Sequence, residues 1–292
     1  MTTKKPETPN PELLPADNGQ SQSFDESLKI AAYGVTGGRK TLQIGHLIER
    51  FGAENVGIIN CEHGLGTISS LTDKRYIYVA HGLTDLRAAW GWANERFNRP
   101  DQWVCVDGGS RALDWINHAI FKGAQDALEG LLDNPQRSML EPTVRKYASY
   151  VSKDFDLNSQ QMWWRTGYEC SQLLDAFIRI GSNMYWTFWE DQTSISQYVK
   201  GAPWIPETPG KGSLAAVKGA FDFIFRLVPD GENVTAIFRN PPGNNANYTK
   251  TRDDWRGGVH LPDRIENFNL ADLVEIIRPA GNKPATANQP TE

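Results

Sequence analysis

Gly34-Val-Thr-Gly-Gly-Arg-Lys-Thr41 is the stretch that decides the fold of this 292-residue chain. It follows an apolar run at 28–33 and leads into a segment at 42–50 whose apolar residues have helical spacing. A strand, a glycine-rich turn and a helix that opens on Lys-Thr place backbone N–H groups around phosphate groups. In such loops the lysine reaches the β and γ oxygens, and the threonine hydroxyl helps to hold Mg²⁺. The segment therefore predicts a site for a nucleoside triphosphate and Mg²⁺.

One position departs from the usual pattern G-x-x-x-x-G-K-[ST], because Arg39 stands where the second glycine belongs. Its side chain would either add a contact to a phosphate or distort the loop and weaken binding. An ordinary glycine-rich surface turn is the competing interpretation of the whole segment, and the rest of the chain decides between them. The candidate phosphate-binding residues are Gly34, Gly37, Gly38, Arg39, Lys40 and Thr41.

The composition is that of a folded domain, with 39% hydrophobic residues and enough chain for one sizeable core. The apolar runs are short and interrupted by charge, so we expect no membrane-spanning helix and, from the N-terminus, no secretory signal. Three widely separated cysteines, Cys61, Cys105 and Cys170, favour buried free thiols in a reducing compartment, the cytoplasm. A net charge of −5 argues against a surface that binds DNA everywhere, and leaves open a local basic groove between subunits.

Strand-like and helical segments alternate through most of the chain. The predicted strands are 29–33, 56–60, 76–80, 103–107 and 184–189, and the predicted helices are 41–51, 84–97, 111–132 and 160–180. Such alternation is typical of an α/β fold with a mostly parallel sheet flanked by helices. Residues 221–239, with the turn Asp230-Gly231-Glu232-Asn233, predict an antiparallel hairpin added at one edge.

The ends of the chain differ in composition from its middle. Residues 1–23 are rich in Pro, Thr, Asn, Gln and Ser, and predict a disordered arm. The tail at 280–292 has the same character, so a single domain is expected over 24–279. Within it, the proline- and charge-rich stretch at about 134–158 predicts a helical insertion or a mobile excursion.

Two acidic residues follow apolar strands at the edge of the sheet where ligands bind. Glu62 comes just after the run 56–60 and could polarise a water that attacks a γ-phosphate; capping a turn is its alternative role. Asp107 ends the run Trp103-Val-Cys-Val-Asp107, the form of a Walker-B strand, whose carboxylate supports Mg²⁺. Its alternative role is to cap the next helix. Thr41 and Asp107 are therefore the candidate metal residues.

A third motif is the pair Lys250 and Arg252 in Asn247-Tyr-Thr-Lys250-Thr-Arg252-Asp253. A Lys-x-Arg pair in a strand or turn puts both cations on one side, where they could reach a phosphate across a subunit boundary. A solvated charged face is the alternative interpretation of such a cluster.

In this order, the four segments resemble the RecA-like core ATPases, and most closely the phage-encoded branch associated with single-strand annealing and recombination. Cys61-Glu62-His63-Gly64-Leu65 is similar to the Ala-Glu-His-Ala-Leu that carries the catalytic glutamate of RecA, and Trp103–Asp107 resembles its Walker-B strand. The resemblance covers about 29–277. It implies ATP and Mg²⁺ as cofactors, Glu62 as catalytic base, and Lys250 and Arg252 as catalytic cations supplied in trans in a ring or filament. It also implies single-stranded DNA as a partner.

Aromatic residues and one loop bear on the DNA partner. Trp186 and Phe188 alternate along a predicted strand and fit a core better than a base-stacking groove, whereas Trp163-Trp164 fit either. The glycine- and proline-rich segment 198–213 is the preferred DNA-binding loop, with a structural lid as its alternative; its candidate contacts are Lys200, Trp204 and Lys211.

The resemblance leaves other questions open. Either Glu190 or Gln192 could be the sensor that follows the strand at 184–189. Two alternative functions also remain: an assembly protein that keeps the nucleotide fold without turnover, as Arg39 would permit, and a hexameric DNA motor.

Overall fold

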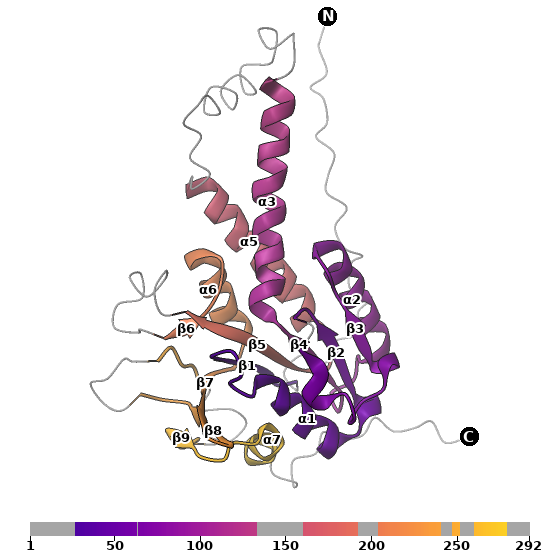
Figure 1. Ribbon diagram of the computed structural model, residues 1–292, viewed down its shortest axis with the longest axis vertical. Helices are drawn as coiled ribbons and strands as arrows, with labels where there is room; N and C mark the ends of the chain where they lie inside the picture. Colours follow the sequence, from indigo (N-terminus) through magenta and orange to yellow (C-terminus); the bar gives the residue numbers. More distant parts are fainter. Residues whose placement is uncertain are drawn as a thin grey trace, which may run out of the picture.

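A mostly parallel sheet forms the centre of the computed structural model (Figure 1), which describes residues 27–62, 64–132, 160–191, 204–240, 247–251 and 260–278. In the described residues the strand order is β3-β2-β4-β5-β1-β7-β8-β9, with β6 paired to β5. The strands are β1 (Lys29–Gly34), β2 (Val56–Asn60), β3 (Ile77–Val79), β4 (Trp103–Asp107), β5 (Asn183–Asp191), β6 (Ile205–Pro206), β7 (Phe223–Asp230), β8 (Asn233–Ile237) and β9 (Arg264–Ile265). The predicted α/β fold, with antiparallel strands at one edge, is confirmed.

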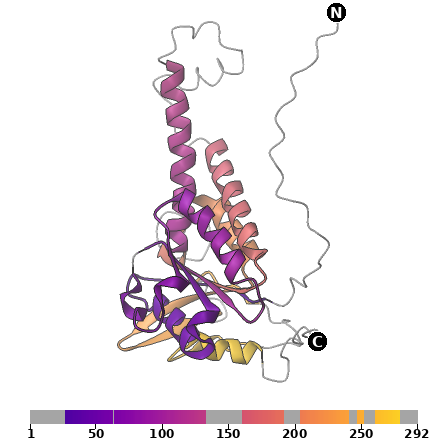
Figure 2. The same ribbon diagram turned by 90° about the vertical axis from the view of Figure 1, so that its right-hand side faces the viewer.

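Helices cover both faces of the sheet (Figures 1 and 2). Helices α1 and α7 pack on one face, and α2, α3, α5 and α6 pack on the other. Their bounds are α1 (Lys40–Phe51), α2 (Leu83–Arg96), α3 (Gly109–Leu132), α5 (Gln160–Ile178), α6 (Gly210–Ala220) and α7 (Leu270–Ile277). Helix α3 extends well beyond the sheet in both views.

Strand β1 contributes to a hydrophobic core on each face. Ile30 and Ala32 belong to the core under α1 and α7, whereas Ala31 and Tyr33 belong to the core under α2, α3, α5 and α6. All six residues of β1 are buried, as expected for a central parallel strand whose side chains alternate between two covered faces.

Trp186 and Phe188 of β5 are core residues, as predicted. Trp186 and Phe188 have no exposed surface, and their rings pack against Phe221 at centroid distances of 6.0 and 6.1 Å. Trp163 and Trp164 differ from each other. The first makes an edge contact with the Phe121 ring of α3, whereas the second is 72% exposed.

One local prediction was wrong. The segment 198–213 is not a loop to its end, because α6 begins at Gly210, so Lys211 lies in the first turn of a helix. The glycines and prolines suggested a loop, but the Leu214–Val217 stretch buries two apolar residues on one helical face. The predicted hairpin, in contrast, is present: β7 and β8 pair antiparallel at the edge of the sheet, and β7 also continues the parallel sheet beside β1.

Several predictions concern residues that the structure does not describe. The predicted arm at 1–23, the insertion at about 134–158 and the tail at 280–292 lie outside them, and the domain bounds 24–279 stay a prediction. Cys61, Cys105 and Cys170 are buried free thiols. Among the described helices, none combines the length and apolar character needed to cross a bilayer.

Lys29, at the start of β1, gives the fold a pH dependence. The residue is 5% exposed, and its ammonium donates to the carbonyl oxygens of Ser182 at 2.7 Å and Ile180 at 3.3 Å. Burial lowers the pKa of Lys29 to about 7, and the Asp222 carboxylate only partly opposes this. An unfolded lysine stays protonated to about pH 10. Above pH 7 the unfolded state therefore binds more protons than the folded state, and stability rises with pH.

We predict that the free energy of unfolding of the wild type rises, relative to that of Lys29→Met, between pH 7 and 10. The slope should approach about 1.4 kcal/mol per pH unit, since one proton is taken up on unfolding. Urea denaturation at several pH values measures it, with Lys74→Met, at an exposed lysine, as the control. If the wild type and Lys29→Met change in parallel, Lys29 is not the group responsible.

Candidate nucleotide-binding site

The loop between β1 and α1 has a conformation that depends on its glycines. Gly37 has a φ of 76°, a left-handed conformation that favours glycine. A Cβ on Gly38 would lie 2.8 Å from the carbonyl oxygen of Val35, which accepts the Gly38 N–H at 2.9 Å. At the start of the loop, a Cβ on Gly34 would collide with the backbone carbonyl oxygen of Leu227 in β7. Three of the predicted glycines are therefore required by the geometry of the loop or its close packing.

Arg39 adopts the conformation that explains why a glycine is usual at this position. Its φ is 59° and its ψ 23°, in the left-handed region, which costs a non-glycine residue about 1–2 kcal/mol. Its guanidinium donates to the carbonyl oxygen of Gly231, in the turn between β7 and β8, at 3.3 Å. The arginine thus keeps the backbone path of the loop and connects it to the hairpin.

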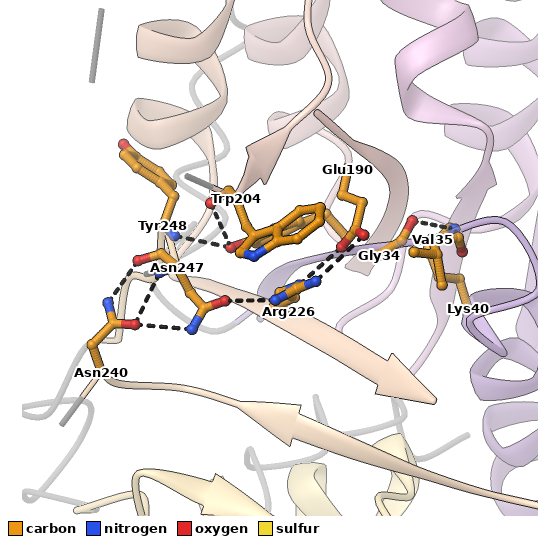
Figure 3. Close-up of polar contacts among 10 residues, drawn as sticks. Gly34, Val35, Lys40, Glu190, Trp204, Arg226, Asn240, Asn247 and Tyr248 are labelled. Atoms are coloured by element: carbon orange, nitrogen blue, oxygen red, sulfur yellow. Dashed lines mark hydrogen bonds and ion pairs between the residues drawn. The ribbon is translucent and has the colours of Figure 1, made fainter. Parts of the chain in front are cut away.

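Lys40 is the first residue of α1 and its side chain folds back over the loop. The ammonium donates to the carbonyl oxygens of Gly34 at 2.9 Å and Val35 at 2.8 Å (Figure 3). Burial lowers the pKa of Lys40, while the carboxylates of Glu62 and Asp107 oppose this. The lysine is therefore a buried cation held at the mouth of the loop by backbone carbonyls.

Asp107 lies at the end of β4, next to Thr41. Its carboxylate is 2% exposed and accepts from the hydroxyl of Thr41 at 2.9 Å and from that of Thr187 at 2.9 Å. The Thr187 hydroxyl oxygen accepts the Gly108 N–H at 2.9 Å. Burial raises the pKa of Asp107, and the hydrogen bonds from both threonines and the charge of Lys40 oppose the rise. Thr41 and Asp107, predicted together as metal residues, are in contact.

Glu62 lies two residues after β2, at the same edge of the sheet. Its Oε2 accepts from the indole N–H of Trp189 at 3.1 Å, and its Oε1 is buried with no hydrogen-bond partner among the described residues. Burial and then the charge of Asp107 raise the pKa of Glu62, whereas Lys40 and the Trp189 hydrogen bond lower it. The structure brings this carboxylate close to both the lysine and the candidate metal residues.

A cavity of about 400 Å³ adjoins the loop. Its lining residues come from the loop, the end of β5 and the region of β6: Gly34, Val35, Thr36, Trp189, Glu190, Trp204 and Glu207. The Arg226 guanidinium stacks over the Trp204 ring, with its Cζ 4.0 Å from the ring centroid. The cavity therefore combines loop backbone with two indoles and two carboxylates.

A partly buried ion pair crosses over β1 beside this cavity (Figure 3). Arg226 of β7 donates to Glu190 of β5 at 2.9 Å, and the two side chains are 14% and 5% exposed. Strand β1 lies between these two strands, and Arg226 also donates to Asn247 at 3.1 Å. Glu190 is thus the sensor candidate that lines the cavity, whereas Gln192 lies outside the described residues.

Of the other predicted residues in the described part of the chain, Trp204 lines the cavity beside the loop, whereas Lys250 contacts the end of α6. The Lys250 ammonium donates to the carbonyl oxygens of Lys218 and Phe221, where α6 ends. The backbone of Lys250 pairs with Ile224 of β7. Ile224 in turn pairs with Ala31 of β1, which lies three residues before Gly34. Lys200 and Arg252 lie outside the described residues.

Three contributing residues were missed from the sequence: Thr187, Trp189 and Arg226. Val106 pairs with Trp186 in the sheet, so the next residues, Asp107 and Thr187, are level with each other and point to the same face. Trp189, two residues further along β5, points to that face too. That register could have placed them, but only once the strand order was known. Arg226 carried no signal, because a single arginine in an apolar strand has many possible roles.

The described residues fit a nucleotide with Mg²⁺. The glycines leave the loop backbone open, one buried lysine supplies a cation, and Thr41 with Asp107 supplies the hard oxygen ligands that Mg²⁺ prefers. The unpartnered Oε1 of Glu62 further indicates a site that is completed by a ligand or water.

Comparison with known proteins gives little further information. No protein-family model matches the chain, and no curated protein matches it. Among solved structures, the crystal structure of the RadB recombinase is similar, with a TM-score of 0.37 and 12% sequence identity. The match covers 78% of this chain and 89% of that chain. A likeness this distant carries no argument about family or function.

We predict that Gly34→Ala lowers the free energy of unfolding by about 1–3 kcal/mol, because the new methyl group overlaps a backbone carbonyl in β7. Urea denaturation measures the loss. Gly219→Ala is the matched control, since nothing lies within 4 Å of a Cβ there and alanine favours a helix. If Gly34→Ala is as stable as wild type, β1 and β7 are not in this close contact.

Proposed function

We propose that this chain is a RecA-like ATPase of the phage type, which binds ATP and Mg²⁺ and acts in DNA recombination. The observation that carries the proposal is the meeting of Lys40, Thr41, Asp107 and Glu62 at one edge of the sheet. These residues come from three elements far apart in the sequence. A glycine-rich surface turn gives no reason for a buried lysine, a buried carboxylate and a partly buried carboxylate to converge on it.

Each residue would have a distinct part in the reaction. The glycines and Lys40 would bind the β- and γ-phosphates, and Thr41 and Asp107 would hold Mg²⁺ directly or through water. The ion, when bound, supplies charge neutralisation on the phosphate oxygens. Glu62 would orient the attacking water and accept its proton, for which a carboxylate with a raised pKa is suited.

Lys250 and Arg252 would act in trans, in a ring or filament. Neither Glu62 nor Asp107 can neutralise the charge that develops on the γ-phosphoryl oxygens, and a cationic side chain in that role is worth about 10³–10⁵ in rate. Lys250 pairs with the amino-terminal half of β7, and its ammonium contacts the end of α6 and not the loop of its own chain. A neighbour's nucleotide is the more natural target.

Single-stranded DNA is the proposed partner. Lys211 lies in the exposed first turn of α6, and Lys200 and Trp204 belong to the segment that precedes it. A second candidate contact is an aromatic pair on α5. Trp164 and Tyr168 are 72% and 50% exposed and stack with their centroids 5.8 Å apart. Exposed aromatic rings suit a strand whose bases stack, and lysines suit its phosphates.

One experiment distinguishes this function from its alternatives: ATP turnover measured with and without single-stranded DNA, together with the particle mass with and without ATP. We expect turnover that DNA stimulates and a mass that rises with ATP. ATP binding without turnover would favour an assembly protein, and translocation along DNA by a closed hexamer would favour a motor. No binding of ATP would contradict the proposal.

We predict that Lys40→Ala weakens ATP binding at least tenfold, about 1.4 kcal/mol, because it removes the buried cation of the loop. Asp107→Asn should instead bind ATP as the wild type does without Mg²⁺, but gain nothing when Mg²⁺ is added. Calorimetry with and without Mg²⁺ measures both effects, and the Mg²⁺-free titrations are the control. Wild-type affinity for Lys40→Ala, or wild-type Mg²⁺ dependence for Asp107→Asn, would contradict these roles.

We predict that Lys211→Ala reduces the salt dependence of single-stranded DNA binding. Removing one lysine that neutralises a phosphate should lower the slope of log affinity against log salt by about 0.7, because one fewer counterion is released. Fluorescence anisotropy over a series of salt concentrations measures the slope, with Lys74→Ala as a surface control. An unchanged slope would remove Lys211 from the DNA interface.

A further inference from the structure

Trp189 of β5 reaches across the end of a neighbouring strand to contact Glu62. In the sheet, β4 lies between β5 and β2, so the two residues start two strand spacings apart, about 9–10 Å. The indole N–H nevertheless donates to Oε2 of Glu62 at 3.1 Å. A long, rigid side chain spans much of this gap with few rotatable bonds.

Gly108 provides the room for this contact. It follows β4 with a φ of 101°, a conformation that favours glycine. A Cβ there would lie 2.5 Å from Cγ and 2.9 Å from Oε1 of Glu62. The Glu62 side chain therefore lies over a position that has no side chain of its own.

The backbone of Trp189 is fixed from three directions. Its N–H donates to the hydroxyl oxygen of Ser110 at 2.9 Å, and its carbonyl oxygen accepts the Glu207 N–H at 2.8 Å. Its Cα is the sheet partner of Gly34, the first residue of the loop. The indole is therefore attached to a rigid backbone that touches the loop itself.

The two oxygens of Glu62 have different surroundings. Oε2 accepts the indole N–H, while Oε1 is buried without a hydrogen-bond partner among the described residues. The charged groups that act on this carboxylate are Asp107, Lys40 and Arg111, and within the described part of the chain none of them holds it by a hydrogen bond. A buried acceptor without a partner costs about 1–3 kcal/mol, so Oε1 is the oxygen available to a water.

We propose that Trp189 is the positioning residue of Glu62, which fixes one carboxylate oxygen and leaves the other to accept a proton from water. This inference rests on the proposed ATPase function for its role in turnover. The contact itself is present without nucleotide and can be tested separately.

NMR spectroscopy of the ¹⁵N-labelled, nucleotide-free protein tests the contact through the indole N–H signals of its tryptophans. Trp189→Phe removes one of ten tryptophans and so assigns its signal. We expect Glu62→Gln to shift that signal more than any other indole signal, because the bond to a charged acceptor becomes a bond to a neutral one. The control is Glu49→Gln, at an exposed residue of α1. If Glu62→Gln leaves the position of the Trp189 signal unchanged, the proposal is overturned.

Kinetics test the role. Trp189→Phe should lower kcat about tenfold to a hundredfold, the worth of one hydrogen bond to a charged group, and change KM less. In a Glu62→Gln background it should cause no further loss, since both changes act on one group. Trp90→Phe is the matched control, because it loses an indole hydrogen bond at 3.0 Å to Ala176, which lies away from the site.

The kinetic outcomes separate the two proposals. A wild-type kcat in Trp189→Phe, or an additive loss in the double variant, would overturn the positioning role. A wild-type protein with no turnover would contradict the ATPase function, and the indole signal would then still decide whether Trp189 holds Glu62.

Discussion

The buried carboxylate of Asp107 is the group on which the arrangement of the site depends. At 2% exposure, a carboxylate is stable only with hydrogen bonds and nearby positive charge, and here these come from Thr41, Thr187 and Lys40. Thr41 and Lys40 lie in the first turn of α1, and Thr187 lies in β5. Satisfying one acidic group therefore connects α1 to β4 and β5. The same hydrogen bond holds Thr41 and Asp107 together, as the proposed Mg²⁺ site requires.

Much of this arrangement could be predicted from the sequence, because the determining features are local. The apolar run before Gly34, the run that ends at Asp107 and the position of Glu62 after its strand are all visible in short windows of the chain. Parallel strands then bring the acidic residues to one edge. What could not be predicted depends on register. Trp189 meets Glu62, and Arg226 meets Glu190, across one intervening strand, and no short window contains either pair.

The wrong loop prediction has a different origin. The glycines and prolines near Gly210 predict a loop by composition, but burial of Leu214 and Val217 favours a helix there. At Arg39, in contrast, the glycine of the consensus pattern reflects a backbone conformation. The left-handed conformation is kept although the residue is not glycine, so the loop geometry is imposed by its surroundings: the close packing of Gly34 at one end and α1 at the other.

Strand β1 belongs to the hydrophobic cores on both faces of the sheet, and this has a consequence for local unfolding. Neither layer of helices can separate from the sheet without exposing side chains of this strand. The amide protons of β1 should therefore exchange with solvent only when the described core unfolds as a whole. A ligand that stabilises the loop at Gly34 would then slow exchange in both cores together, and protection far from the nucleotide would report its binding.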